Sequence, residues 1–328
     1  QVLQAPHDQA TDHGYNPHPL EAAHIGFTSG STGQPKGVVT THASLAARTS
    51  WVCEHWPGGP GGARLAKSAP TAIDATAELC EAFVTGESIV LATDDEARDA
   101  AAIGRLLTTH GIGHFMAVPG LVEAVTIASP GIVSDRDRVL STGEPLLAGV
   151  AASIYRAAEN VQLHNSYGCT ETTGDVTAGR VSRGDAESGS ISIGQPLPGS
   201  RCYVLSADMT LSPPGALGEL YVEGQQLARG YLAQPALTSA RFVANPFNTG
   251  GRLYRTGDLV RWREEGRLEL VGRIDDQVNI RGHRVEPDET VAELYTLPDV
   301  KEAIVLPRSV DSTMELVAYV SGDGLEPP

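Results

Sequence analysis

A loop that combines glycines, hydroxyl side chains and a single lysine lies near the beginning of the sequence. Residues 27–37 read FTSGSTGQPKG. Glycines let backbone N–H groups converge on an anion, and the hydroxyl groups add donors that carry no charge. The loop is not a Walker A sequence, because Lys36 is followed by Gly37 and not by serine or threonine. The pattern therefore predicts a phosphate site of another kind.

The segments on either side of this loop indicate how it is held. HIGFT (24–28) is typical of a strand, and SLAARTSWVCEHW (44–56) is typical of a helix. A flexible Ser/Gly linker is the alternative interpretation of the loop. Such linkers do not sit between an apolar strand and an amphipathic helix. We therefore favour a strand that leads into a phosphate loop.

The remainder of the N-terminal half alternates predicted helices with short apolar strands. SIVLA (88–92) and GHFMAVP (113–119) are expected to be strands, and EARDAAAIGRLLTTHG (96–111) between them is expected to be a helix. Helices that alternate with buried strands predict an α/β fold. We expect a large subdomain built on a parallel sheet with covering helices.

The pattern changes near residue 190, where short strands are separated by Gly, Pro and Asp turns. This is typical of an antiparallel, β-barrel-like part. DETVAELYTLP (288–298) then predicts a helix, and AIVLPR (303–308) and ELVAYVS (315–321) predict strands. We expect a large subdomain over residues 1–274 and a small, incomplete α+β C-terminal subdomain over 275–328.

Composition excludes several classes of function. The 328 residues carry 24 Lys and Arg against 40 Asp and Glu, a formal charge of −16, which argues against nucleic acid or a membrane as partner. No apolar run approaches the roughly 18 residues that span a bilayer, so we expect a cytoplasmic protein. The cysteines (Cys53, Cys80, Cys169, Cys202) contain no CxxC pair and the histidines are scattered, which disfavours a zinc site or a disulfide framework.

Five motifs in sequence order resemble those of the adenylate-forming superfamily. TSGSTGQPKG (28–37) resembles its phosphate loop, and NSYGCTE (165–171) resembles its NxYGPTE motif. GELYVEGQQLARGYL (218–232) is similar to GELxIxGxxVARGYL, and YRTGDL (254–259) matches outright. GRIDDQVNIRGHRVE (272–286) resembles GRxDxQVKIRGxRIE. The ARGYL and YRTGDL style resembles an adenylation domain of a nonribosomal peptide synthetase.

The resemblance implies a reaction in two steps. A carboxylate attacks the α-phosphate of ATP and releases pyrophosphate, and the acyl group then passes to the phosphopantetheine thiol of a carrier protein. The implied cofactors are ATP and Mg²⁺, with Glu171 as the metal ligand. The implied catalytic residues are Lys36, Thr170, Glu171 and Arg284. Asp275 is the implied hinge about which the C-terminal subdomain rotates.

The resemblance also implies which residues hold the nucleotide. The loop residues would cover the β- and γ-phosphates, Thr170 would contact the α-phosphate, and Asp258 would accept both ribose hydroxyls. Asn165, Ser166 and Tyr167 would form the adenine wall. The full implied set is Thr28, Ser29, Gly30, Ser31, Thr32, Gly33, Asn165, Ser166, Tyr167, Gly168, Asp258 and Arg273.

The stretch TAIDATAELCEAF (71–83) resembles the family's FDxSVWE segment and implies where the substrate binds. Asp74 falls where amino-acid-activating members keep an aspartate for the substrate ammonium. The other implied pocket residues are Ala75, Glu78, Met116, Leu140, Thr142, Ser166, Gly174 and Asp175. Two carboxylates, Glu78 and Asp175, repel each other in a desolvated pocket unless a cation joins them. We therefore expect a cationic side chain, as in ornithine, lysine or arginine. A neutral polar side chain is the alternative, if salt pairing or protonation neutralises either acid.

The sequence departs from the family pattern at both ends. Only 26 residues precede Phe27, and the chain stops before the NGKxDR motif, whose lysine bridges carboxylate and phosphate during adenylation. We therefore expect binding of nucleotide and amino acid with strongly impaired adenylation. The rival interpretations are an acyl- or aryl-CoA ligase of the same superfamily, which Asp74 disfavours, and a binding-only remnant. The sequence leaves open whether a small helper protein is needed for solubility.

Overall fold

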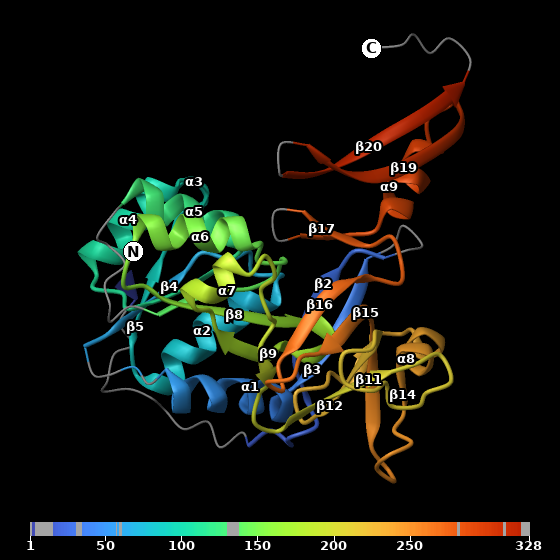
Figure 1. Cartoon of the computed structure of the whole chain (residues 1–328), viewed down its shortest axis with the longest axis horizontal. Helices are drawn as coiled ribbons and strands as arrows, with labels where there is room; N and C mark the ends of the chain where they lie inside the picture. Colours follow the sequence, from blue (N-terminus) through green and yellow to red (C-terminus); the bar gives the residue numbers. More distant parts are fainter. Residues whose placement is uncertain are drawn as a thin grey trace.

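The phosphate-loop region is held in a small antiparallel sheet of the computed structural model (Figure 1). β2 (Ala22–Thr28) and β3 (Lys36–Thr41) pair on either side of the loop, and β13 (Gly230–Tyr231) joins β3 from far along the chain. α1 (His42–His55) follows directly, so the predicted strand and helix are confirmed. The structure describes residues 2–3, 16–30, 35–56, 58, 61–129, 138–280, 283–310 and 313–322. Ser31, Thr32 and Gly33 of the predicted loop lie outside these residues.

The central sheet has five strands in the order β10-β9-β8-β7-β6. β6 (His114–Ala117), β7 (Arg138–Ser141) and β8 (Gln162–Cys169) are parallel, whereas β9 (Gly174–Arg180) and β10 (Gln195–Pro196) run antiparallel. A second sheet pairs β4 (Ala63–Ala66) and β5 (Ser88–Leu91) in parallel, with β1 (Val2–Leu3) antiparallel at its edge. The predicted parallel sheet is therefore confirmed for its central strands.

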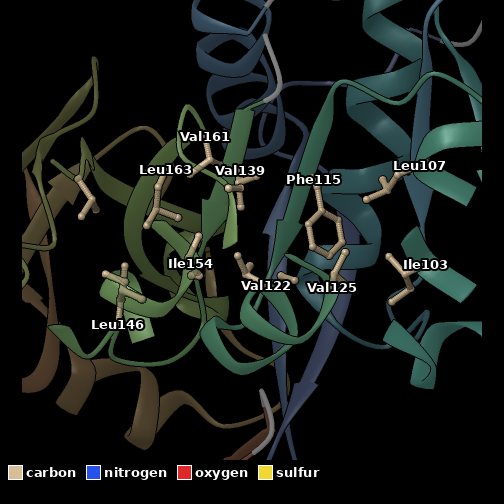
Figure 2. Close-up of a cluster of buried hydrophobic side chains, with 14 of the residues drawn as sticks. Ile103, Leu107, Phe115, Val122, Val125, Val139, Leu146, Ile154, Val161 and Leu163 are labelled. Carbon is tan, nitrogen blue, oxygen red and sulfur yellow. The ribbon is translucent and has the colours of Figure 1, made fainter. Parts of the chain in front are cut away.

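Helices cover both faces of the central sheet. On one face lie α4 (Ala100–Thr109), α5 (Pro119–Ala128) and α6 (Ala148–Ala157), and Figure 2 shows their apolar side chains meeting those of β6, β7 and β8. Ile103, Val122, Ile154 and Leu163 in this cluster are fully buried. Burial of such side chains contributes about 1.5–3 kcal/mol each to stability. On the other face, α1 and α2 (Ile73–Thr85) pack against Met116 and Leu140.

The helix expected over residues 96–111 is two helices in the structure. α3 (Asp94–Arg98) and α4 are separated by Asp99, whose backbone is extended at φ −108° and ψ 109°. The Asp99 carboxylate accepts a hydrogen bond from the Ala101 N–H at 2.9 Å and so caps α4. Asp99 therefore ends α3 and begins α4, although the spacing of apolar residues around it is typical of one continuous helix.

The region after residue 190 is a curled antiparallel sheet, as predicted. Its order is β11-β12-β15-β14, and β16 pairs with a later stretch of β15, on the edge opposite β12. The bounds are β11 (Ser200–Leu205), β12 (Gly218–Gly224), β14 (Phe242–Ala244), β15 (Arg252–Trp262) and β16 (Leu268–Arg273). Two short helices lie in connections between strands: α7 (Arg183–Glu187) between β9 and β10, and α8 (Pro235–Arg241) between β13 and β14.

The small C-terminal part begins after β16. It comprises β17 (Val278–Ile280), β18 (His283–Val285), α9 (Pro287–Leu294), β19 (Val300–Val310) and β20 (Thr313–Gly322). The predicted helix and both predicted strands are confirmed. Figure 1 shows β19 and β20 projecting away from the large part, while β17 lies nearer to it. Within the described ranges, no helix combines the length and the apolar character needed to cross a membrane.

Candidate active site

The carboxyl ends of the central strands bring one group of predicted residues together. Thr142 follows β7, Ser166 lies in β8, and Asp175 lies in the neighbouring β9. The Oδ1 atom of Asp175 accepts hydrogen bonds from Thr142 Oγ1 at 2.7 Å and from Ser166 Oγ at 2.8 Å. Ligand sites in α/β sheets commonly form at this edge. The sequence therefore identified a real cluster of polar groups here.

Asp175 is also paired with an arginine that the sequence analysis missed. Arg48 in α1 is 2% exposed, and its Nη2 lies 2.7 Å from Asp175 Oδ2. Its Nη1 lies 3.2 Å from Glu81 Oε1, and the other oxygen of Glu81 pairs with Arg64 at 3.1 Å. Arg64 in turn pairs with Glu87. A buried chain of alternating charges thus runs behind the pocket. A lone arginine inside the predicted helical segment LAARTSW was the available signal.

Glu78 is held by the loop between β4 and α2. Its carboxylate accepts hydrogen bonds from the backbone N–H groups of Lys67 and Ser68, both at 3.0 Å, and from Ser68 Oγ at 2.8 Å. Lys67 Nζ lies 3.1 Å from Glu78 Oε1. The premise that Glu78 and Asp175 lack a cation unless the substrate supplies one is therefore wrong. Each acid already faces a cation of the chain.

Asp74 differs from these paired acids. It lies in the first turn of α2, is partly buried, and makes no hydrogen bond or ion pair with any other described residue. Burial raises the pKa of its carboxyl group to about 6, and the nearby carboxylates of Asp175 and Glu78 add to this rise against Lys67 and Arg48. Asp74 is therefore an acid that the charges of Lys67 and Arg48 reach but that forms no direct ion pair with a described residue.

The other predicted pocket residues form the apolar and backbone walls. Ala75, Met116 and Leu140 are buried, and the last two pack in the core beneath α1 and α2. Gly174 has φ +93°, and a Cβ atom at this position would lie 3.3 Å from Arg48 Nε. Glycine therefore satisfies the backbone conformation here and leaves the guanidinium of Arg48 uncovered from this side.

The predicted metal ligand, Glu171, is fully buried in η1 (Thr170–Thr172), directly after β8. Arg284 Nη1 lies 2.9 and 3.1 Å from its two carboxylate oxygens, and Tyr231 Oη donates to Oε1 at 2.8 Å. Burial alone would raise the pKa of this carboxyl group, but Arg284 and Tyr231 outweigh it and lower the pKa to about 2. Glu171 is therefore ionised and tightly held. Thr170, one residue earlier, begins η1.

The phosphate loop is tied to the C-terminal part. Lys36 Nζ lies 3.3 Å from Glu286 Oε1, and Ser29 Oγ donates to the carbonyl oxygen of Arg284 at 2.6 Å. Thr28 Oγ1 is buried and has no hydrogen-bond partner among the described residues. Gly30 is buried beside them. The structure thus brings Lys36, Glu171 and Arg284 to one place, with Glu286 as a member that the sequence analysis did not single out.

A second acid–base pair forms where β15 and β16 lie side by side. Arg273 Nη1 lies 2.6 Å from Asp258 Oδ1, and Tyr167 Oη donates to the other oxygen of Asp258. Arg273 Nε and Nη2 also contact both oxygens of Asp275, at 2.6 and 2.9 Å. Burial raises the pKa of the Asp258 carboxyl group, and Arg273 opposes that rise. Asp258, Tyr167, Arg273 and the predicted hinge residue therefore form one cluster.

Two further predicted residues support the backbone of this region. Asn165 Nδ2 donates to the carbonyl oxygen of Ser192 at 2.8 Å, and its buried Oδ1 has no partner within the described part of the chain. A Cβ atom on Gly168 would lie only 2.0 Å from the carbonyl oxygen of Gly174. Any side chain at position 168 would therefore force β8 and β9 apart.

Comparison with known proteins agrees with this geometry. The sequence pattern of the family described as AMP-binding enzyme matches residues 3–232. Gramicidin S synthase 2 of Aneurinibacillus migulanus is 36% identical over 92% of this chain, and tyrocidine synthase 3 of Brevibacillus parabrevis is 40% identical over 92%. The chain spans only 7% and 5% of the lengths of these two relatives.

Solved structures give the same result. The holo form of an NRPS protein containing adenylation and PCP domains, bound to a vinylsulfonamide inhibitor, superimposes with a TM-score of 0.84 at 26% identity over 93% of this chain and 53% of that chain. The Vibrio cholerae adenylation domain AlmE, in complex with glycyl-adenosine-5′-phosphate, gives 0.82 at 25% identity over 94% and 59%. The chain belongs to the AMP-binding enzyme family, a family of adenylate-forming ligases. The predicted resemblance to the adenylation domains of nonribosomal peptide synthetases is confirmed.

Proposed function

We propose that this chain binds ATP and an amino acid and forms an aminoacyl adenylate, with release of pyrophosphate. The acyl group then passes to the phosphopantetheine thiol of a peptidyl carrier protein. The observation that carries the proposal is Asp74, a partly buried carboxylate that forms no direct ion pair with a described residue. An acyl or aryl carboxylate brings no ammonium to such a site. Asp74 therefore favours an amino acid over the substrates of a CoA ligase.

The nucleotide is assigned to the groups around Glu171 and Asp258. Lys36, Ser29 and Thr28 supply a cation and two hydroxyls for the phosphates, and Asp258 supplies two acceptor oxygens for the ribose. The complex of Vibrio cholerae AlmE with glycyl-adenosine-5′-phosphate supports an aminoacyl adenylate as occupant. Arg273 pairs with Asp258 and Arg284 pairs with Glu171, so two cations lie beside the acids assigned to the nucleotide.

Mg²⁺ fits Glu171 as part of a site completed by the nucleotide. The described residues contain no group of three or more His, Cys, Asp or Glu side chains that could hold a metal by themselves. Mg²⁺ is commonly bound by one or two carboxylates together with substrate phosphates, and Glu171 is one ionised carboxylate beside the phosphate loop. When bound, the ion neutralises charge that develops on the phosphate oxygens.

For the substrate side chain we propose a cationic group, as in ornithine, lysine or arginine. Five carboxylates in and behind the pocket face three cations. The carboxylates are Asp74, Glu78, Glu81, Glu87 and Asp175, and the cations are Arg48, Arg64 and Lys67. The substrate ammonium matches one of the two surplus acids, and a basic side chain matches the other. A neutral polar side chain is the second candidate, because Glu78 and Asp175 already have partners.

We also propose that residues 1–274 act as the large subdomain and 275–328 as a mobile one, with Asp275 as the hinge. The contacts of Asp275 with Arg273 support this position, because they join the last strand of the curled sheet to the C-terminal part. A carrier protein as acyl acceptor is supported by a solved neighbour that contains adenylation and PCP domains.

Calorimetry with non-hydrolysable aminoacyl-adenylate mimics tests the proposal without depending on turnover. Lysyl, ornithyl, arginyl, leucyl and glutamyl forms are compared with a deaminated acyl mimic. We expect every mimic with an ammonium group to bind more tightly than the deaminated one, and the basic mimics to bind most tightly. At 100 times its dissociation constant, a mimic should stabilise the chain by about 2.7 kcal/mol.

The matched variants are Asp74→Asn and Asp95→Asn. Both aspartates lie in the first turn of a helix, but Asp95 lies in α3, outside the pocket. Asp74→Asn should abolish the preference for an ammonium group, and Asp95→Asn should leave it unchanged. Equal affinity of the wild type for amino and deaminated mimics would favour the CoA-ligase alternative. Tight binding without adenylation by the complete protein would favour the binding-only alternative.

A further inference from the structure

Arg48 occupies an unusual position for a charged side chain. It lies in the middle of α1, is 2% exposed, and reaches Asp175 from the side of the carboxylate opposite to Thr142 and Ser166. A cation at this place is costly to bury and stays only because Asp175 and Glu81 surround it. Arg48 therefore offsets the negative charge of Asp175 and Glu81 at the wall of the pocket.

Arg48 also contacts residues that the proposed function assigns to the substrate side chain, namely Asp175 and Gly174. Its Nε lies against Gly174, where no side chain intervenes, and this N–H has no hydrogen-bond partner within the described residues. The positive charge of Arg48 extends to Asp74 as well, because it opposes the rise in the pKa of that carboxyl group. A substrate cation that moved deeper than Asp175 would meet the guanidinium at close range.

We propose that Arg48 is a specificity-determining residue that acts as the pocket's own cation and limits how long a basic side chain the pocket accepts. The proposal rests on the proposed function, namely that this pocket binds the side chain of an amino acid. A short basic group, such as the ammonium of ornithine, stops before Arg48. The guanidinium of an arginine substrate extends further and is repelled by Arg48, since like charges disfavour each other in a desolvated site.

The test measures the dissociation constants of ornithyl and arginyl adenylate mimics by calorimetry. In the Arg48→Met variant the aliphatic bulk is largely kept while the charge is lost, and Asp175 and Glu81 become available to the substrate. We expect the affinity for the arginyl mimic, relative to the ornithyl mimic, to rise at least tenfold. A ratio within twofold of the wild-type value would overturn the proposal.

Arg64→Met is the matched control. Arg64 is also buried and also pairs with Glu81, but it makes no contact with Asp175. This variant should lose stability and keep the wild-type ratio of affinities. If Arg64→Met changed the ratio as much as Arg48→Met, the effect would come from general loosening of the buried chain of charges, and the proposal would be wrong.

A second pair of variants keeps the test decisive if Arg48→Met does not fold. Asp175→Asn leaves Arg48 without one of its two carboxylates, so the basic mimics should bind at least tenfold more weakly. Adding Arg48→Met removes the uncompensated cation and should restore affinity to within threefold of the wild type. Failure of the second change to restore binding would contradict the assigned role.

The two hypotheses fail in different ways. If the wild type binds no mimic, or binds deaminated and amino mimics equally, the proposed function is wrong. Alternatively, the wild type prefers ammonium-bearing mimics through Asp74 while Arg48→Met leaves the ratio of arginyl to ornithyl affinity unchanged. In that case only the role of Arg48 is wrong.

Discussion

The amino-acid pocket and the nucleotide region differ in which part of the chain supplies the partners of their ion pairs. In the amino-acid pocket, every ion pair joins residues of the large part, as in Arg48–Asp175 and Lys67–Glu78. In the nucleotide region, two ion pairs take their partner from the C-terminal part, namely Arg284–Glu171 and Glu286–Lys36. One set of pairs is internal to a packed core, and the other bridges two parts of the chain.

The difference indicates which charges the substrates displace. The pair of Arg48 and Glu81 is deeply buried, with side-chain exposures of 2% for both residues, so we expect it to persist when substrates bind. The bridging pairs use Lys36 and Glu171, the groups that the proposed function assigns to phosphate and metal. We therefore expect nucleotide binding and the contact of Arg284 in β18 with Glu171 to compete.

The largest expected effect is a loss of free energy of unfolding when an ion pair of the amino-acid pocket is broken. Arg48→Met leaves Asp175 and Glu81 each without one buried partner, and breaking such pairs costs about 3–5 kcal/mol. Arg284→Met should cost less, because the side chain of Arg284 is 16% exposed and Glu171 keeps the hydrogen bond from Tyr231. Urea unfolding of both variants measures the difference. An equal loss in the two variants would contradict the distinction between internal and bridging pairs.

Tyr231 provides the next test, because its hydroxyl donates a hydrogen bond to Glu171 that does not depend on Arg284. Hydrogen bonds to charged groups contribute about 1.5–3 kcal/mol, so Tyr231→Phe should lower the free energy of unfolding by that amount. It should also weaken binding of Mn²⁺, used in place of Mg²⁺, together with a non-hydrolysable ATP analogue. Tyr203→Phe is the control, because Tyr203 donates to Glu223 at 2.7 Å, outside the residues assigned to nucleotide and substrate. The same loss of Mn²⁺ affinity in both variants would contradict a positioning role for Tyr231.

The competition at Glu171 predicts a gain in affinity as well as losses. Arg284→Met frees the carboxylate of Glu171 from its ion pair, so Mn²⁺ with the ATP analogue should bind about tenfold more tightly, within the usual range of coupling between sites. Titration calorimetry measures this gain. Arg241→Met, which removes a partner of Asp275 at 3.9 Å, should leave Mn²⁺ affinity unchanged. Weaker binding in Arg284→Met would mean that Arg284 assists the nucleotide and does not compete with it.

The sequence was most informative where a motif carries several groups of one site. The alternation of strands and helices predicted the α/β part, the motifs pointed to Glu171 and Asp258, and Asp175 was one of the pocket residues implied by the resemblance. The pairing of Asp175 and Glu171 was not predictable, because their partners Arg48 and Arg284 come from segments far away in the sequence. Asp99 shows the same limit locally, since its capping role divided a segment that periodicity alone had joined.

The smallest expected effect concerns pH, and it separates Asp74 from the paired acids. Burial raises the pKa of its carboxyl group to about 6. Between the ordinary pKa of aspartate and about pH 6, this group is therefore protonated in the folded chain and ionised in the unfolded chain. Stability contributed by the protonated form is therefore lost as the pH rises through about 6, and Asp74→Asn should be relatively more stable at pH 8 than at pH 4. A substrate ammonium requires the ionised form, so mimic binding should be about fourfold weaker at pH 5.5 than at pH 7. His114 and His164 do not interfere, because burial lowers their pKa values to about 3 and about 4. Calorimetry at the two pH values checks this, and an Asp74→Asn variant with the same pH dependence would assign the titration to another group.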